Sequence, residues 1–106
     1  MGMRIVIADL DGTISDYALD REETEIVIIT ARSDDNRPAT QEWLKLNDVP
    51  CDRLIMRPKD DNSSDAECKR KLFEQKINYS NVWFVLEDRK SVVDMWRGEG
   101  LTCLQV

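Results

Sequence analysis

Two aspartates, Asp9 and Asp11, stand two positions apart directly after a short apolar run, Ile5 to Ala8. In an extended chain, residues i and i+2 point to the same side, so both carboxylates can project into one crevice while Leu10 turns back toward the core. The run is largely β-branched and continuously apolar, which favours a strand buried on both faces of a parallel sheet. Such sheets bind ligands beyond the carboxyl ends of their strands, so this acidic pair marks a candidate functional site.

A surface turn is the alternative interpretation, because Asp-Gly is also a common hairpin signal. A hairpin would need a polar, alternating partner strand directly after the turn. The sequence instead continues with the polar stretch 15–24 and then with another strand of the buried type. We therefore favour the functional interpretation.

Carboxylates carry most of the chemistry that this composition allows. The chain has no histidine, which excludes a Ser-His or Cys-His nucleophile pair and an imidazole metal site. The three cysteines, Cys51, Cys68 and Cys103, are odd in number and have no CxxC spacing. This pattern indicates reduced thiols rather than a disulfide framework or a zinc site.

Further polar groups follow other apolar runs. Thr30 places a hydroxyl after the run Ile26 to Ile29, and Arg32 beside it could bind a phosphate bidentately. Taken alone, these two are more simply a strand-terminal threonine and a surface arginine. Glu87 and Asp88 follow a five-residue apolar run, and helix capping would explain one of these acids but not both.

Strand-like and helix-like patterns alternate along the chain. The patterns predict strands at 4–8, 25–30, 53–56, 82–86 and 101–106, and helices from Ser33 to about 46, at 65–76 and at 90–97. The first helix is expected to bury Ala39, Trp43, Leu44 and Leu46. This alternation predicts an α/β fold with a parallel sheet and right-handed crossovers. With 106 residues, the chain is expected to form one domain, 1–106.

The connection 14–24 is short for a parallel crossover, which takes a dozen or more residues with its helix. Either the segment from Tyr17 to Thr24 is an abbreviated crossover, or residues are missing from the sequence at this point.

Composition narrows the class of protein. No apolar run approaches the ~20 residues of a membrane span, and no signal segment opens the chain, so we expect a cytoplasmic protein with no membrane contact. A net charge of -6 argues against a broad nucleic-acid-binding face, which depends on clustered Lys and Arg.

The run from Asp9 to Thr13, an Asp-x-Asp-Gly-Thr motif after an apolar strand, resembles the first motif of the haloacid dehalogenase (HAD) superfamily of phosphohydrolases. The resemblance implies a Rossmannoid three-layer sandwich with a five-stranded parallel sheet and no sizeable cap domain. It implies a phosphate contact from Thr30 and its neighbour Ala31, and a lysine that neutralises the phosphoryl group, for which Lys69 and Lys71 compete. It also implies a site for Mg²⁺ formed by Asp9, Asp11, Glu87 and Asp88.

A narrower resemblance covers residues from about 25 to the end, especially Asp88-Arg89 and the run Met95-Trp96-Arg97. This half is similar to the 3′-phosphatase domain of bacteriophage polynucleotide kinase–phosphatase. The resemblance favours Lys69 over Lys71 and implies these further roles: nucleophile Asp9, acid/base Asp11, and phosphate or substrate contacts from Thr13, Arg32, Arg57 and Asp65. Glu87 stands where that domain has aspartate, and the sequence contains no GxxxxGK[ST] phosphate loop for a kinase half.

The expected function is magnesium-dependent hydrolysis of a phosphomonoester through an aspartyl-phosphate, with a nucleic-acid 3′ end or a nucleotide as substrate. The alternatives are a phospho-accepting receiver-like domain and a non-catalytic phosphate-binding domain. A receiver carries its acceptor aspartate on a middle strand, whereas these acids end the first. The sequence leaves the physiological substrate and the oligomeric state open.

Overall fold

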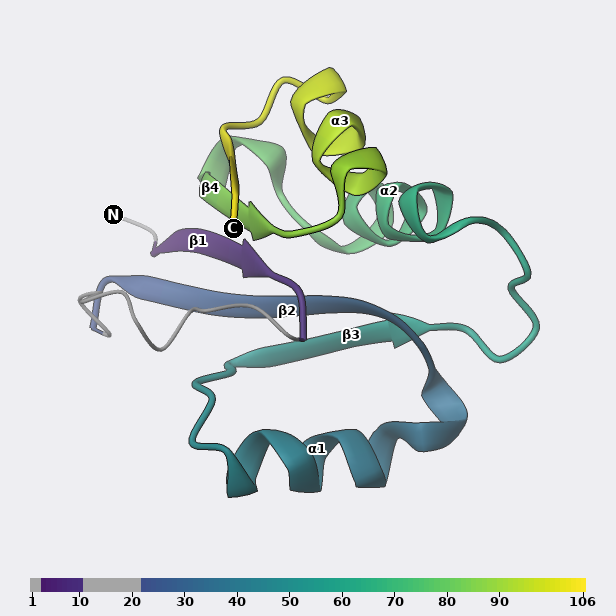
Figure 1. Ribbon diagram of the computed structural model, residues 1–106. Coiled ribbons are helices and arrows are strands. Elements are labelled where there is room, and N and C mark those ends of the chain that lie inside the picture. Colours follow the sequence, from purple (N-terminus) through teal and green to yellow (C-terminus); the bar gives the residue numbers. More distant parts are fainter. Residues whose placement is uncertain (1–2, 11–21) are drawn as a thin grey trace.

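Five parallel strands form one sheet in the order β3-β2-β1-β4-β5 (Figure 1). The structure is a computed structural model that describes residues 3–10 and 22–106. Asp11, Thr13 and most of the connection 14–24 lie outside these residues. The strands are β1 (Arg4–Ala8), β2 (Thr24–Ser33), β3 (Arg53–Arg57), β4 (Val82–Glu87) and β5 (Cys103–Gln105).

The central position of β1 places the site. β1 pairs with β2 on one side and with β4 on the other, and Val6 and Ile7 are buried. The strand order reverses here, since β2 and β3 extend the sheet one way and β4 and β5 the other. Such a reversal opens a crevice at the carboxyl ends of the strands, where Asp9 follows β1.

Helices cover both faces of the sheet, which gives the predicted three layers (Figure 1). Helices α2 (Asp65–Lys76) and α3 (Lys90–Gly98) lie on one face, and α1 (Arg37–Leu46) lies on the other. Two short 3₁₀ turns, η2 (Asp34–Asn36) and η3 (Tyr79–Asn81), precede α1 and β4. Among the described residues, no helix has the length and apolar character needed to cross a membrane.

Alternation along the buried strands divides the core between the two faces. Ile7 and Ile29 pack with α2 and α3, where Trp96 and Phe73 meet edge to face at a centroid distance of 5.5 Å. On the other face, Leu10 packs with Ile28 of β2 and with α1. Both faces of the central strands are therefore buried, as their unbroken apolar character predicts.

Helix α1 differs from the prediction in its buried face. Thr40 and Leu44 are buried, whereas Ala39 is exposed, Trp43 is 37% exposed and Leu46 is 73% exposed. Thr40 and Leu44, four positions apart, form a narrow buried stripe. The rest of the helix surface stays exposed because, among the described residues, α1 has no helical neighbour on its side of the sheet. The prediction that Ala39, Trp43 and Leu46 are also buried was wrong.

Candidate active site

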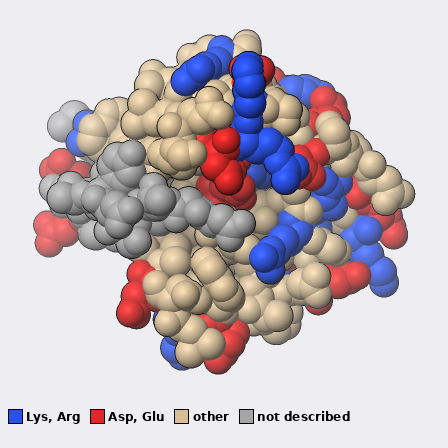
Figure 2. Space-filling model, viewed as in Figure 1, with Lys and Arg blue, Asp and Glu red and all other residues tan. Residues whose placement is uncertain are grey.

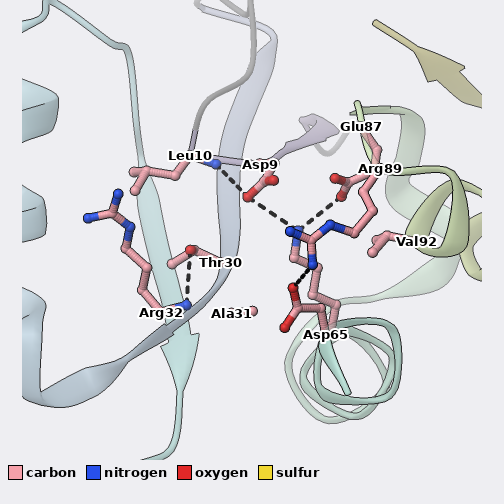
Figure 3. Close-up of a pocket in the computed structure, with 10 residues that line it drawn as sticks. Asp9, Leu10, Thr30, Ala31, Arg32, Asp65, Glu87, Arg89 and Val92 are labelled. Carbon is pink, nitrogen blue, oxygen red and sulfur yellow. Dashed lines mark hydrogen bonds and ion pairs between the residues drawn. The ribbon is translucent and has the colours of Figure 1, made fainter. Parts of the chain in front are cut away.

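A pocket of about 240 Å³ opens at the carboxyl ends of β1, β2 and β4, beside the start of α2 (Figure 3). Its lining joins residues that are distant in sequence: Asp9, Leu10, Thr30, Ala31, Arg32, Asp65, Lys69, Glu87, Arg89 and Val92. The structure thus brings together most of the residues that the motifs predicted, at the sheet edge where parallel strands present their ends.

The Lys69 ammonium lies between two carboxylates at the floor of the pocket. Its Nζ is 3.2 Å from Asp9 Oδ1 and 3.0 Å from Glu87 Oε1. The side chains of Lys69 and Glu87 are only 3% and 2% exposed, while that of Asp9 is 22% exposed. Ion pairs at such depth are weakly screened by salt and sensitive to the loss of either partner.

The start of α2 aims Lys69 and not Lys71 into the pocket. Ser64 caps the helix by accepting a hydrogen bond from the Glu67 N–H at 3.2 Å. Positions 69 and 71 differ by about 200° around a helix, so their side chains leave in nearly opposite directions. Lys71 instead pairs with Asp61 at 3.0 Å.

Asp61 belongs to the loop 58–64 and is held there by local hydrogen bonds. The Ser63 hydroxyl and backbone N–H both donate to Asp61 Oδ1, and the Lys71 ammonium lies beside its other oxygen. These donors, the Ser63 hydroxyl above all, hold the pKa of the Asp61 carboxyl well below its usual range. Lys71 therefore neutralises a loop acid rather than a group in the pocket.

Asp9 keeps one oxygen free of described donors. Its Oδ1 accepts from the Leu10 N–H at 2.7 Å and also faces Lys69. Among residues 3–10 and 22–106, no hydrogen bond or ion pair engages Oδ2. The carboxylate is thus oriented through one oxygen while the other can meet an electrophile.

Three acids at or beside the pocket fit a hard cation, although Asp88 is exposed and lies outside the pocket lining. Carboxylate oxygens of Asp9, Glu87 and Asp88 lie within 4.8 Å of one another. Among the described residues, Glu87 Oε2 is buried and accepts no hydrogen bond of good geometry, while the Trp96 indole N–H beside this carboxyl favours its charged form. Burial raises the pKa of the Glu87 carboxyl; the Lys69 ammonium opposes this shift and the Asp9 charge adds to it. An all-oxygen donor set of this kind suits Mg²⁺.

The end of β2 supplies a hydroxyl and a guanidinium. Thr30 is buried, and its Oγ1 accepts from the Arg32 N–H at 3.2 Å, which turns the chain at the pocket wall. The Arg32 guanidinium is exposed, points away from Asp9 (Figure 3), and has no ion pair with any residue that the structure describes. It is available to an anion that approaches the rim.

Arg57 lies outside the pocket lining, and its donors are used within the protein. Its Nε donates to the Ala31 carbonyl at 2.7 Å, and its Nη1 donates to the carbonyls of Asp61 and Ser63 at 3.1 and 2.7 Å. Its Nη2 donates to Asp65 Oδ1 at 3.0 Å. Arg57 therefore braces the end of β2 against the loop 58–64; direct contact with substrate stays a prediction.

Arg89 is a pocket residue to which the sequence assigned no role. It donates from Nη1 to Asp65 Oδ2 (Figure 3). Because Arg57 donates to the other carboxylate oxygen, Asp65 bridges two guanidinium groups. The signal that could have found it was its position directly after the acidic pair Glu87 and Asp88. Asp11 and Thr13, which complete the predicted set, lie outside the described residues.

A family model described as "Polynucleotide kinase PNKP phosphatase domain" matches residues 17–106. The chain is also 30% identical over 123 residues to a putative bifunctional polynucleotide kinase/RNA ligase of Autographa californica nuclear polyhedrosis virus. That match covers 89% of this chain but only 18% of the viral protein.

Two solved structures are similar in fold. A chain in the structure of the Pnkp1/Rnl/Hen1 RNA repair complex superposes with a TM-score of 0.83 at 29% identity, over 98% of this chain and 42% of that chain. The core domain of a putative phosphoglycolate phosphatase from Streptococcus pneumoniae TIGR4 gives a TM-score of 0.57 at 17% identity, over 99% and 80% of the two chains. This chain thus spans less than half the length of the viral kinase/ligase and of the chain from the RNA repair complex.

Proposed function

Because this chain belongs to the polynucleotide kinase PNKP phosphatase domain family, we propose that it is a magnesium-dependent phosphatase that removes the 3′-phosphate from nucleic-acid ends or nucleotides. The reaction would pass through an aspartyl-phosphate on Asp9. The observation that carries the proposal is the buried Lys69 ammonium between Asp9 and Glu87 at the end of the central strand.

Charge balance supports the assignment. Asp9, Glu87 and Asp88 bring three carboxylates against one buried ammonium, and a phosphomonoester adds further negative charge. We assign Asp9, Glu87 and Asp88 as the residues that would hold Mg²⁺, with Asp11 as the fourth predicted ligand. When bound, the ion supplies positive charge that offsets this repulsion and polarises the phosphoryl oxygens.

The first chemical step uses Oδ2 of Asp9, the oxygen that no described residue engages. Oδ2 attacks phosphorus in line, so the aspartyl–phosphorus bond forms as the ester P–O bond breaks. Asp11 gives a proton to the departing oxygen and then takes one from the water that hydrolyses the aspartyl-phosphate. Lys69, held on Oδ1, orients the Asp9 carboxylate for attack.

The β2 end holds the transferred group from the other side. The Thr30 hydroxyl is placed to donate to a phosphoryl oxygen, since its donor is not used in the bond from Arg32 N–H. Arg32, whose guanidinium points away from Asp9, offers two parallel N–H donors to a phosphate oxygen that approaches from the rim. A hydroxyl already held at the pocket wall lowers the cost of orienting the substrate.

The strand order argues against a receiver-like domain. Receiver domains of the flavodoxin-like type follow the order 2-1-3-4-5, whereas this sheet has the order β3-β2-β1-β4-β5. The acidic strand is central in the sheet here, but it is the first strand of the chain. A non-catalytic phosphate-binding domain would not need a carboxylate nucleophile held against a buried lysine at the floor of the pocket.

The test is an assay of phosphate release with Mg²⁺ on a 3′-phosphorylated oligonucleotide, a 5′-phosphorylated oligonucleotide and free nucleotides. We expect hydrolysis of 3′-phosphates, its loss on chelation of the metal, and no turnover by Asp9→Asn, because an amide cannot act as the nucleophile. Asp60→Asn, which changes an exposed loop acid, is the matched control and should keep full activity. Metal-dependent turnover by folded Asp9→Asn would refute the assignment.

A further inference from the structure

Arg89 stands at the mouth of the pocket rather than at its floor. Its side chain is 62% exposed, whereas those of Lys69 and Glu87 are almost fully buried. The reacting phosphorus must come within reach of Asp9 at the floor. A group at the rim therefore meets the part of the substrate that stays outside.

The orientation of Arg89 is fixed by Asp65. Asp65 is itself anchored, because its Oδ1 accepts from Arg57, whose other donors are bound to backbone carbonyls of Ala31 and Ser63. Arg89 uses one nitrogen, Nη1, on Asp65 Oδ2. A guanidinium carries five N–H donors, and the hydrogen bonds among the described residues use only one nitrogen of Arg89.

We infer that Arg89 is a specificity residue that binds the internal phosphodiester adjacent to the terminal 3′-phosphate, and that Asp65 is the residue that positions it. This inference rests on the proposed function. The transferred phosphate reaches Asp9, Lys69 and Thr30 at the floor, and the next phosphate along a polynucleotide lies beyond the sugar, outside the floor. An arginine suits this second anion because its planar fork matches phosphate oxygens and loses little freedom once held.

The competing account is that Arg89 and Asp65 form an ordinary surface ion pair. Exposed pairs contribute little to stability and would leave substrate preference unchanged. The two accounts differ in one respect: only the specificity role depends on whether the substrate has an internal phosphodiester.

The experiment compares kcat/KM of the wild-type protein and Arg89→Ala on a nucleoside 3′-monophosphate and on a dinucleotide with a 3′-phosphate. We expect Arg89→Ala to lose roughly tenfold on the dinucleotide, mainly through KM, because one charge-assisted contact at an exposed rim is removed. The mononucleotide, which has no internal phosphodiester, should change by less than about twofold. Lys90→Ala removes an equal charge from the next residue, which is exposed and pairs with Asp94, and should change neither substrate.

An uncharged linkage in the substrate tests the contact between Arg89 and the internal phosphodiester separately. When a methylphosphonate replaces the internal phosphodiester, the wild-type protein should lose about the same tenfold, and Arg89→Ala should lose almost nothing further. Asp65→Asn should reduce the preference for the dinucleotide while Arg89 is still present, because the guanidinium is no longer held.

Each result decides between the possibilities. Equal losses by Arg89→Ala on both substrates, or no loss on either, would overturn the inference while leaving the phosphatase assignment intact. Failure of the wild-type protein to hydrolyse either 3′-phosphate would overturn the proposed function and this inference with it.

Discussion

At the scale of single residues, one ammonium group organises the site. Lys69 contacts both Asp9 and Glu87, so it orients the proposed nucleophile and also balances a carboxylate that is 2% exposed. Burial raises the pKa of the Glu87 carboxyl, and the Lys69 ammonium acts in the opposite direction. The chemistry of the pocket therefore depends on a buried ion pair. Removing one partner leaves the other charge buried and uncompensated, which destabilises the folded protein.

We predict that Lys69→Ala abolishes most of the phosphatase activity, whereas Lys71→Ala keeps it within about threefold. Lys69 contacts Asp9 directly, and Lys71 is committed to Asp61. Steady-state kinetics on a 3′-phosphorylated oligonucleotide would measure both variants. Equal losses would mean that the geometry of α2 does not distinguish the two lysines.

The stability of these lysine variants separates a chemical loss from unfolding. Lys69→Ala should lower the free energy of unfolding by about 3 kcal/mol, because the Glu87 carboxylate stays buried without its cation. Adding Glu87→Gln should recover part of this loss, since a neutral amide is cheaper to bury. Urea titration of the single and double variants checks the expectation; a double variant less stable than Lys69→Ala would contradict it.

At the scale of elements, the loop 58–64 is attached to the sheet through one side chain. The Arg57 side chain is 14% exposed, and it reaches the end of β2, two carbonyls of the loop and the first residue of α2. The backbone groups of a loop need such partners when they are partly buried. Arg57 thereby sets where α2 begins and, through α2, where Lys69 points.

We predict that Arg57→Lys lowers the free energy of unfolding by about 2 kcal/mol, because an ammonium cannot hold four separated acceptors as a planar fork does. Activity should also fall, since Asp65 and the start of α2 would lose their anchor. Arg70→Lys is the matched control. Among the residues that the structure describes, Arg70 pairs with Glu67 and Glu74 on the same helix surface, and the loss of stability should stay under about 0.5 kcal/mol. Equal destabilisation in urea would show that Arg57 is an ordinary surface arginine.

At the scale of the whole molecule, the charge distribution limits how nucleic acid can bind. The chain has a net charge of -6, and the pocket lining contains three basic side chains, Arg32, Lys69 and Arg89. On the face shown in Figure 2, the described Lys and Arg side chains are interspersed with acidic ones rather than joined in a basic stripe. Contact should therefore be confined to the end of the polynucleotide.

We predict a slope of log affinity against log salt of about -1 to -3, because counterion release scales with the number of phosphates neutralised. The value of kcat/KM should rise from a mononucleotide to a dinucleotide and then level off with length. Kinetics on 3′-phosphorylated single strands of increasing length, at several salt concentrations, would measure both. A continued gain with length and a steep slope would reveal an extended binding surface.

The sequence alone determined the elements and the chemistry at their ends. Apolar periodicity located all five strands and predicted the bounds of α2 as 65–76, as observed. The acids after the first and fourth strands predicted the pocket, because parallel strands end at a common edge. The motifs also identified the phosphatase family, which the match over residues 17–106 confirms.

Tertiary structure decided what depends on contacts between distant segments. The order of the strands, with β1 at the centre, follows from pairing between segments far apart in the chain, which local patterns do not encode. The same holds for the exposed Trp43 and Leu46, since the buried face of a helix depends on what covers it. Lys69 and Lys71 are equally basic, and the direction of α2 is what brings Lys69 to Asp9 and Lys71 to Asp61. Arg57 and Arg89 both pair with Asp65, and burial is what separates them, since their side chains are 14% and 62% exposed.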